Sequence, residues 1–449
     1  MTFSSLFLPF RRTATALSLA ALLGCTFAPA WSQQAAPKKE LSEKVSEDLA
    51  KIRAATDAKN YAEAVAIIDR LLKGAAPESY DLAVLSQVKA QILLTQADYS
   101  KAIDPLETAV LVSERNGYFE PKVNQELRYF LAQLFYQEAV TSKSRDALVR
   151  NYSKAAKYLE QWSKANTKPN PDAQLFFASL LYNQAQIDPN NVDMALIRRS
   201  QEEVEKGLEM TVRPKDTFYV LLLATLQQQN QTARSAEILE LLVKIAPKNK
   251  TYWAQLASTY LNLQQDLRAA LTIERAQVHE AMNTPKDNFN LVGIYFNMQQ
   301  YDQAIALLEK GLRDGSIDSE QRNWELLAAS LQQVRREARA IDVLKEATKQ
   351  FPDSGSLYLT IAQIYYSLDK LEDSYSFAGQ SVTHKLDKPW QAYTFLAYIC
   401  FELKKFSEAL EAINAALKYP EAGKDSERLK KAIEDAIKER EALANSPAA

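Results

Sequence analysis

The chain has 449 residues, of which 47% are apolar and 24% charged, and 54 Lys and Arg against 56 Asp and Glu give a formal net charge of -2. This balance excludes both the basic surface of a nucleic-acid-binding protein and a long acidic tail. The chain contains only 10 Gly and 16 Pro, and its abundant Ala, Leu, Gln, Glu and Lys favour helices over a barrel or sandwich. We therefore expect an all-α protein.

Residues 1–30 have the three-part plan of a secretory signal peptide. The pair Arg11-Arg12 precedes the apolar run Ala14–Gly24, and small residues follow. Ala28-Pro29-Ala30 predicts cleavage after Ala30, with Ala30-Trp31-Ser32 as a neighbouring alternative. The arginine pair also occurs in twin-arginine signals, but Thr13-Ala14-Thr15 does not continue that motif.

A second processing signal overlaps the first. Leu22-Leu23-Gly24-Cys25 reads as a lipobox, which would make residues 1–24 a lipoprotein signal and leave Cys25 acylated. Leu23 is an unusual residue before the glycine of such a motif, so we favour cleavage after Ala30 and a mature protein without a lipid anchor. Either outcome predicts export to the periplasm or cell envelope.

The mature chain starts with a predicted disordered linker, residues 31–40. No later apolar run approaches the roughly 20 residues of a membrane-spanning helix. Cys400 is the one cysteine besides Cys25, so we expect no intrachain disulfide in either processing outcome.

Residues 41–214 predict irregular helical repeats. Asn60–Leu72 and Asp98–Val110 read as second helices of two hairpins, preceded by first helices at Val45–Ala58 and Ala83–Gln96. Two further hairpins follow, the first with a long connection expected at Val140–Arg150. The second has the polar loop Ile187–Asn191 between its helices.

Residues 215–423 predict six regular repeats. With Lys250 as position 1 of a unit, one set of apolar or small residues falls at positions 4, 7, 8, 11, 20, 24 and 27: Trp253, Leu256, Ala257, Tyr260, Ala269, Ile273 and Ala276. This set resembles the tetratricopeptide (TPR) pattern, which has a period of about 34 residues. The same frame recurs in units starting at Asp216, Pro285, Gln321, Gly355 and Trp390.

The repeat pattern predicts a right-handed superhelical solenoid of about ten helix-turn-helix TPR units, because a single unit cannot bury its own apolar face. Residues 424–444 read as the polar capping helix that such arrays require, and residues 445–449 as a frayed tail.

Residue chemistry argues against an enzyme. His279 and His384 stand three repeats apart near the ends of second helices, where a favourable interaction with the helix dipole explains them better than a metal site does. Cys400 occupies a core position, and no glycine-rich phosphate loop occurs. About ten repeats leave no stretch of roughly 100 residues for a catalytic domain. We expect no catalytic residue, no metal and no cofactor.

The predicted binding surface is the inner groove formed by first helices at positions 2, 5, 9, 12 and 13. Amides and aromatic rings dominate these positions in the regular half, and the basic set with which TPR proteins hold a carboxylate terminus is missing. An extended or helical protein segment suits such a surface. The alternative is a structural role, in which the aromatic side chains only pack between adjacent first helices. The candidate residues are Asn262, Phe289, Phe296, Asn297, Gln332, Tyr366, Tyr398 and Phe401.

The chain also resembles a narrower family. The Tyr252-Trp253 pair, "EKGLRDGSI" and "NWELLA" are similar to exported bacterial TPR proteins encoded beside the TonB, ExbB and ExbD energy-transducing components. The likeness runs from about Asp216 to the C-terminal helix. It implies a protein-binding accessory of TonB-dependent uptake without known catalysis, and it carries over no site residue. A scaffold for assembling exported polymers or outer-membrane proteins is the alternative function; the partner's identity and the oligomeric state stay open.

Overall fold

The computed structural model describes residues 39–444, and within this range every element is helical. One isolated bridge, between Ser354 and Lys385, is the single strand-like pairing among these residues. The prediction of an all-α helical-repeat fold is confirmed. The predicted signal peptide with Cys25, linker residues 31–38 and the tail at 445–449 lie outside the described residues.

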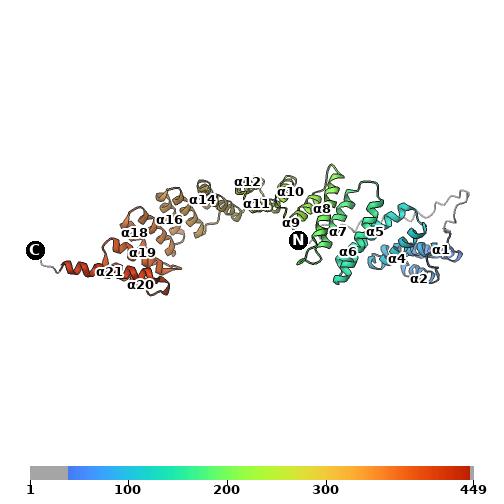
Figure 1. Ribbon diagram of the computed structural model, residues 1–449, viewed down its shortest axis with the longest axis horizontal. Coiled ribbons are helices and arrows are strands. Elements are labelled where there is room, and N and C mark those ends of the chain that lie inside the picture. Colours follow the sequence, from blue (N-terminus) through green and yellow to red (C-terminus); the bar gives the residue numbers. More distant parts are fainter. Residues whose placement is uncertain (1–38, 445–449) are drawn as a thin grey trace. The chain divides into compact units, whose positions relative to one another are not determined.

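The chain divides into two compact units, one up to Ile238 and the other from Leu239 onward. In the first unit, consecutive helices form antiparallel pairs, and each pair packs on the one before it (Figure 1). Its helices are α1 (Glu43–Asp57), α2 (Tyr61–Gly74), α3 (Tyr80–Thr95), α4 (Tyr99–Asn116), α5 (Pro121–Thr141), α6 (Arg145–Ala165), α7 (Pro171–Ala185), α8 (Met194–Glu209) and α9 (Asp216–Gln228). The next helix, α10 (Thr232–Ile245), contains the division.

The second unit repeats the same pairing of a first and a second helix. Its helices are α11 (Lys250–Asn262), α12 (Asp266–Val278), α13 (Pro285–Asn297), α14 (Tyr301–Asp314), α15 (Gln321–Gln333), α16 (Glu337–Gln350), α17 (Gly355–Ser367), α18 (Leu371–Ser381), α19 (Pro389–Glu402) and α20 (Phe406–Ala416). The short 3-10 helix η4 (Pro420–Ala422) leads into α21 (Gly423–Ala444), which packs on α20. The division inside α10 separates two units by their packing contacts. It does not test the predicted change from irregular to regular repeats at residue 215, which stays a prediction.

The turns inside most of the described hairpins share one backbone form. Position 15 of every regular repeat has a left-handed backbone, with φ between 56° and 59° at Asn230, Gln264, Gln299, Arg335, Asp369 and Lys404. The next amide N–H then donates back to position 11, as from Gln265 to the carbonyl of Tyr260 at 2.9 Å. Lys59 and Ala97 have the same conformation in the irregular half. The turns between α5 and α6 and between α7 and α8 contain no residue with positive φ, so the irregular half has this turn only in its first two hairpins.

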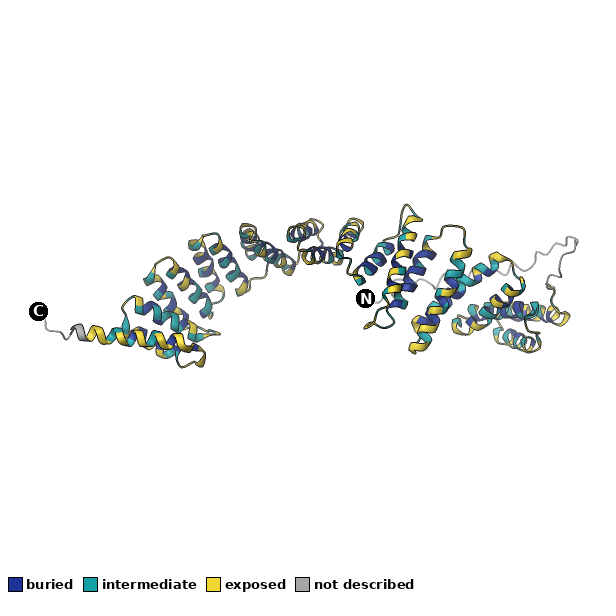
Figure 2. Cartoon of the chain, viewed as in Figure 1, coloured by how far each residue is buried: buried dark blue, intermediate teal, exposed yellow. Residues whose placement is uncertain are grey.

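The core lies between the paired helices. Trp253, Leu256 and Ile273 are 1%, 0% and 3% exposed. Small residues fill position 20, where helices approach each other most closely, and four of these alanines are fully buried: Ala269, Ala304, Ala340 and Ala409. Within each unit, buried residues line the facing sides of the helices and exposed residues their outer sides (Figure 2). The packing roles predicted from the repeat register are therefore confirmed at these positions.

Neighbouring repeats are joined by a recurring polar contact. The tyrosine hydroxyl at position 11 meets the side chain at position 25 of the preceding repeat. Tyr260 donates to Glu240 at 3.1 Å and Tyr295 donates to Glu274 at 2.6 Å. In a third pair the direction is reversed, because the ammonium of Lys345 donates to the hydroxyl of Tyr365 at 2.9 Å.

One predicted connection is wrong. The long loop expected at Val140–Arg150 is a turn of only Ser142–Ser144, because α5 continues to Thr141 and α6 already begins at Arg145. Val140 and Val149 are both 42% exposed. These helix ends therefore bury too little apolar surface to show a helical period in the sequence.

Candidate functional site

The candidate site is the first-helix face of the second unit, meaning the side of α11, α13, α15, α17 and α19 that carries repeat positions 2, 5, 9, 12 and 13. Helical periodicity places these positions opposite positions 4, 7, 8 and 11, which pack in the core. Of the predicted residues, Asn262 and Asn297 are exposed. The other six are half-buried: Phe289, Phe296, Gln332, Tyr366, Tyr398 and Phe401.

Two aromatic rings at position 12 pack on the second helix of their own repeat. The ring of Phe296 meets the edge of Tyr301 with centroids 5.3 Å apart, and Phe401 lies 5.9 Å from Phe406. This packing differs from the expected alternative, in which such rings contact adjacent first helices. It holds the two phenylalanines in place while leaving each partly accessible.

Tyr366 and Tyr398 do meet across neighbouring first helices, α17 and α19. Their hydroxyl oxygens are 3.1 Å apart, and their rings pack edge to face at 5.7 Å. Phe395 adds a third ring, with its centroid 6.0 Å from that of Tyr366. The hydrogen bond with Tyr366, followed by burial, raises the pKa of Tyr398 to about 12. The hydroxyl of Tyr398 is therefore neutral at physiological pH.

Two of the charged side chains on this face have partners. The guanidinium of Arg322 lies 5.5 Å from the ring of Phe289 and 2.6 Å from the carboxylate of Glu320. The carboxylate of Glu325 accepts hydrogen bonds from Gln321 at 2.7 Å and from Ser356 at 3.3 Å. The face thus offers half-buried rings and amides with few charges, a combination suited to peptide groups and apolar side chains.

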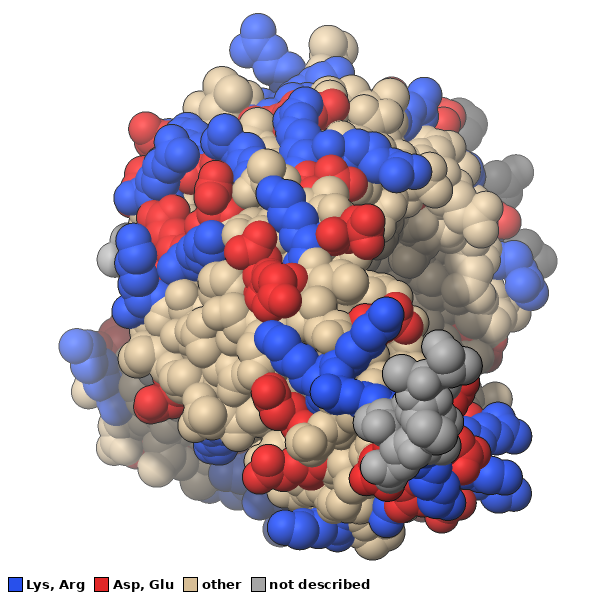
Figure 3. Space-filling view, turned by 90° about the vertical axis from the view of Figure 1, so that its left-hand side faces the viewer, with Lys and Arg blue, Asp and Glu red and all other residues tan. Residues whose placement is uncertain are grey.

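Charge elsewhere is mixed as well. The face of the molecule in Figure 3 carries basic and acidic side chains interspersed around uncharged areas. Among residues 39–444, no group of three or more His, Cys, Asp or Glu side chains is placed to hold a metal ion. Over the same range, no helix is both long and apolar enough to cross a membrane.

The two histidines stack on aromatic rings at position 4. The ring of His279 lies 5.8 Å from that of Trp253, and His384 lies 4.6 Å from Tyr358. Cys400 is 1% exposed, and burial raises the pKa of its thiol to about 11. The thiol of Cys400 is thus a packed, protonated group, as its core position predicts.

The first unit holds an aromatic cluster that was not among the predicted site residues. The ring of Tyr129 lies 4.8 Å from Trp162 and 6.2 Å from Phe176, and Tyr136 lies 5.4 Å from Phe176. The hydroxyl of Tyr136 also accepts a hydrogen bond from Asn183 at 2.9 Å. Burial raises the pKa of both tyrosines. The seven-residue spacing of Tyr129 and Tyr136 was the available signal, because it puts both on one helix side.

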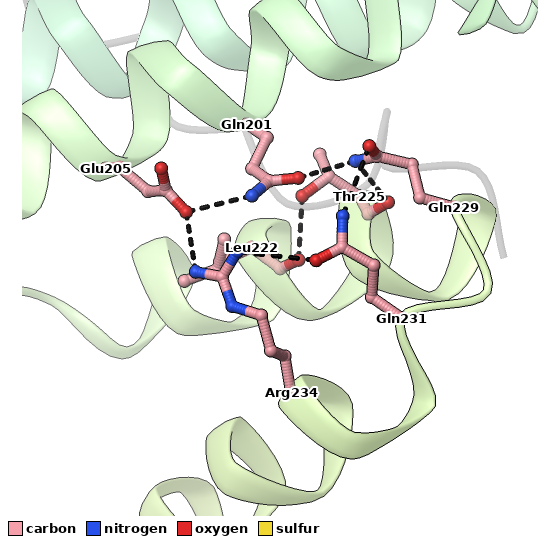
Figure 4. Close-up of polar contacts among 7 residues, drawn as sticks. All are labelled: Gln201, Glu205, Leu222, Thr225, Gln229, Gln231 and Arg234. Carbon is pink, nitrogen blue, oxygen red and sulfur yellow. Dashed lines mark hydrogen bonds and ion pairs between the residues drawn. The ribbon is translucent and has the colours of Figure 1, made fainter.

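A polar network in the first unit was also missed (Figure 4). Gln201 of α8 donates to Glu205 at 2.9 Å and accepts from Gln229, which follows α9, at 2.5 Å. Arg234 also donates to Glu205 at 2.9 Å, and Gln231 donates to Gln229 at 3.3 Å. The network connects the turn after α9 to α8. Its amide groups form hydrogen bonds with other members of the network, which indicates a structural role.

A family model described as "Tetratricopeptide repeat" matches residues 288–313 and 391–422. No curated protein matches the chain. The matched segments fall in α13–α14 and in α19–α20, two of the hairpins that form the candidate site.

Solved structures are similar to this chain at low identity and low TM-score. MamA from Desulfovibrio magneticus RS-1 is 16% identical over 38% of this chain and 93% of its own, with a TM-score of 0.31. YrrB, described as a TPR protein with an unusual peptide-binding site, is 14% identical over 44% and 99%, with a TM-score of 0.33. Yeast Tom70 is 12% identical over 88% and 89%, with a TM-score of 0.32. The family match thus identifies tetratricopeptide repeats at residues 288–313 and 391–422, and the other hairpins of the described residues repeat the same pairing of helices.

Proposed function

We propose that the protein is a non-enzymatic scaffold whose first-helix face in the second unit binds a segment of a partner protein. The observation that carries this proposal is the row of half-buried rings at Phe289, Phe296, Tyr366, Tyr398 and Phe401, with exposed amides beside them. Rings held at half burial supply apolar contact area at little cost in side-chain entropy, and amides can satisfy a bound backbone.

The setting we propose is the bacterial cell envelope, in a role accessory to TonB-dependent transport. The secretory leader in residues 1–30 supports export. The resemblance of the regular repeats to exported TPR proteins encoded beside TonB components supports the transport role. A soluble mature protein is favoured over a form anchored through acylated Cys25.

Affinity purification from envelope extracts tests both levels of this proposal. The tagged full chain should retain a TonB-system component identified by mass spectrometry, and a deletion strain should lose TonB-dependent uptake. Recovery of no TonB-system component together with normal uptake would refute the transport role. In that case, any other protein that the tagged chain retains would test the general scaffold role.

A matched pair of variants tests the face itself. Phe296→Glu with Phe401→Glu places two carboxylates among the rings and should reduce retention of the partner at least about tenfold. Ala306→Glu with Ala338→Glu adds the same charge at exposed positions on the second helices α14 and α16. The control should retain the partner fully. Equal retention by both double variants would put the partner on another surface.

The alternative function is a scaffold for assembling exported polymers or outer-membrane proteins. The same purification separates the two roles, because its retained protein would be a polymer-export or outer-membrane assembly component, and TonB-dependent uptake would be unaffected.

A further inference from the structure

A glycine separates two phenylalanines on the first-helix face. Phe289, Gly293 and Phe296 lie on one side of α13, because spacings of four and three residues each complete about one helical turn. At a rise of 1.5 Å per residue, the two phenylalanines are about 10 Å apart along the helix axis. A Cβ added at Gly293 would meet nothing within 4 Å. The space between the two side chains, which we call the Gly293 gap, is therefore open down to the backbone of α13.

Packing within the array does not account for this glycine. Glycine weakens the interior of a helix, so it is expected where a neighbour leaves no room for a side chain. At three other helical glycines a Cβ would lie within 2.6 Å of another residue: Gly207, Gly311 and Gly355. Gly74 and Gly379, on second helices, are open as Gly293 is. Gly293 differs from both in lying between two aromatic rings on the candidate face.

Each of the two rings has a contact that fixes it without covering the glycine. Phe296 packs edge-on against Tyr301, with centroids 5.3 Å apart, and the guanidinium of Arg322 lies 5.5 Å from the ring of Phe289. Both phenylalanines are half-buried. The gap is thus preformed and has an apolar wall at each end, which suits one uncharged, apolar side chain of a ligand.

A second ring site lies two repeats further along the same face. Tyr366 of α17 meets Tyr398 of α19, with hydroxyl oxygens 3.1 Å apart. Tyr366 and Phe296 both occupy position 12, so the two sites lie at the same level of their helices. Packed helices have axes about 8 to 10 Å apart, so two steps from α13 to α17 separate the sites by roughly 16 to 20 Å.

The helix between the two sites presents amides. α15 contacts α13 through Arg322 and α17 through Glu325. Its position 12 is Gln332, which is half-buried, and its position 13 is Gln333, which is exposed. Each side-chain amide has both donors and an acceptor, as the unpaired backbone groups of an extended segment require. A helical segment bonds its own backbone and would need neither amide, so this part of the face favours an extended ligand.

We propose that the Gly293 gap anchors one apolar side chain of an extended partner segment, and that a second apolar side chain, six residues along the segment, packs at Tyr366. Six residues span about 20 Å at roughly 3.3 Å per residue, and an even spacing keeps both side chains on one side of the segment. The residues between the anchors are uncharged, because they face Gln332 and Gln333. This proposal rests on the proposed function, in which the first-helix face binds a partner segment.

A phage-displayed library of random 12-residue peptides, panned against the full chain, tests the proposal. Enriched peptides should carry two large apolar residues six apart, with uncharged residues between them. Gly293→Leu fills the gap and should weaken binding of such a synthetic peptide at least about tenfold, measured by fluorescence anisotropy. This variant should not lower the thermal midpoint, because leucine favours a helix more than glycine does and its Cβ meets nothing.

Ala306→Leu is the matched control, because it adds a leucine at an exposed position of the second helix α14. It should leave the dissociation constant of the peptide unchanged. Enrichment of no peptide, or of peptides without the six-residue spacing, would overturn the proposal.

The variants also separate this proposal from the function on which it rests. Peptides that bind Gly293→Leu as well as the wild type, but lose binding to Phe296→Glu with Phe401→Glu, would overturn the anchor site and keep the face as the binding surface. Peptides that bind all of these variants equally would overturn both.

Discussion

Removal of the Trp253 side chain tests the repeat register in depth. Its ring is 1% exposed and lies 5.1 Å from the guanidinium of Arg275 and 5.8 Å from the ring of His279. Its indole N–H donates to the carbonyl of Pro247 at 2.7 Å. Trp253→Ala removes these contacts and leaves a cavity, so we expect a loss of about 3 to 5 kcal/mol. Trp253→Phe keeps most of the ring and loses the hydrogen bond, at a cost of about 1 to 2 kcal/mol.

Hydrogen exchange localises this loss. Stacked repeats interact mainly with their neighbours, so the amides of α11 and α12 should exchange at least about 100-fold faster in Trp253→Ala, as a loss of 3 kcal/mol implies. Amides of α1 to α4 should keep their wild-type rates. A loss below about 1 kcal/mol, with unchanged exchange in α11, would refute the assignment of Trp253 to a packed position.

Three further predictions concern stability and pH. Gly311→Ala should destabilise the chain by about 1 to 3 kcal/mol, because the new Cβ would lie 2.5 Å from Ile317. By contrast, the Cβ of Gly293→Ala meets nothing within 4 Å, so this substitution should stabilise α13 by about 0.5 to 1 kcal/mol. Thermal unfolding measures both effects, and equal midpoints for the two variants would contradict the close approach at Gly311. Hydrogen bonds from Arg275 hold the pKa of Glu240 below its ordinary 4.5, so the stability from this pair is present above that pH and is lost as the pH falls through the lowered value. Arg275→Gln should therefore cost about 1 kcal/mol at pH 7 and progressively less in acid, and a pH-independent difference in urea unfolding would count against the tie. Tyr366→Phe should lower the pKa of Tyr398 from about 12 toward its ordinary 10. The signal of Tyr398 is the difference between the ultraviolet titration curves of Tyr366→Phe and of the double variant that also carries Tyr398→Phe, and an unmoved pKa would mean that burial alone sets it.

The regular repeats could be predicted because their core positions are chemically distinct. Trp253, Leu256, Ala257 and Tyr260 fix the register of α11, and all four are buried. The polar residue Gln264 follows this apolar set and has the left-handed backbone of the turn between α11 and α12. Where packing selects the residues, spacing is sufficient to place the helices.

Other features left weaker signals in the sequence. The first turns of α6 are mostly exposed, so the apolar period starts only near Tyr152 and the connection before it was predicted too long. On the candidate face, spacing predicted which residues share a side. It did not show that Phe296 packs on Tyr301 while Tyr366 meets Tyr398, because these contacts depend on side-chain rotamers and on the spacing between neighbouring helices.

Photocrosslinking tests the central claim, partner binding on the first-helix face, most directly. A benzophenone amino acid at Phe296 or Phe401 of the full chain should capture the same partner protein in envelope extracts. The same probe at the exposed position of Ala306, on the outer side of α14, should capture none. Capture from Ala306 alone, or from no position, would contradict binding at this face.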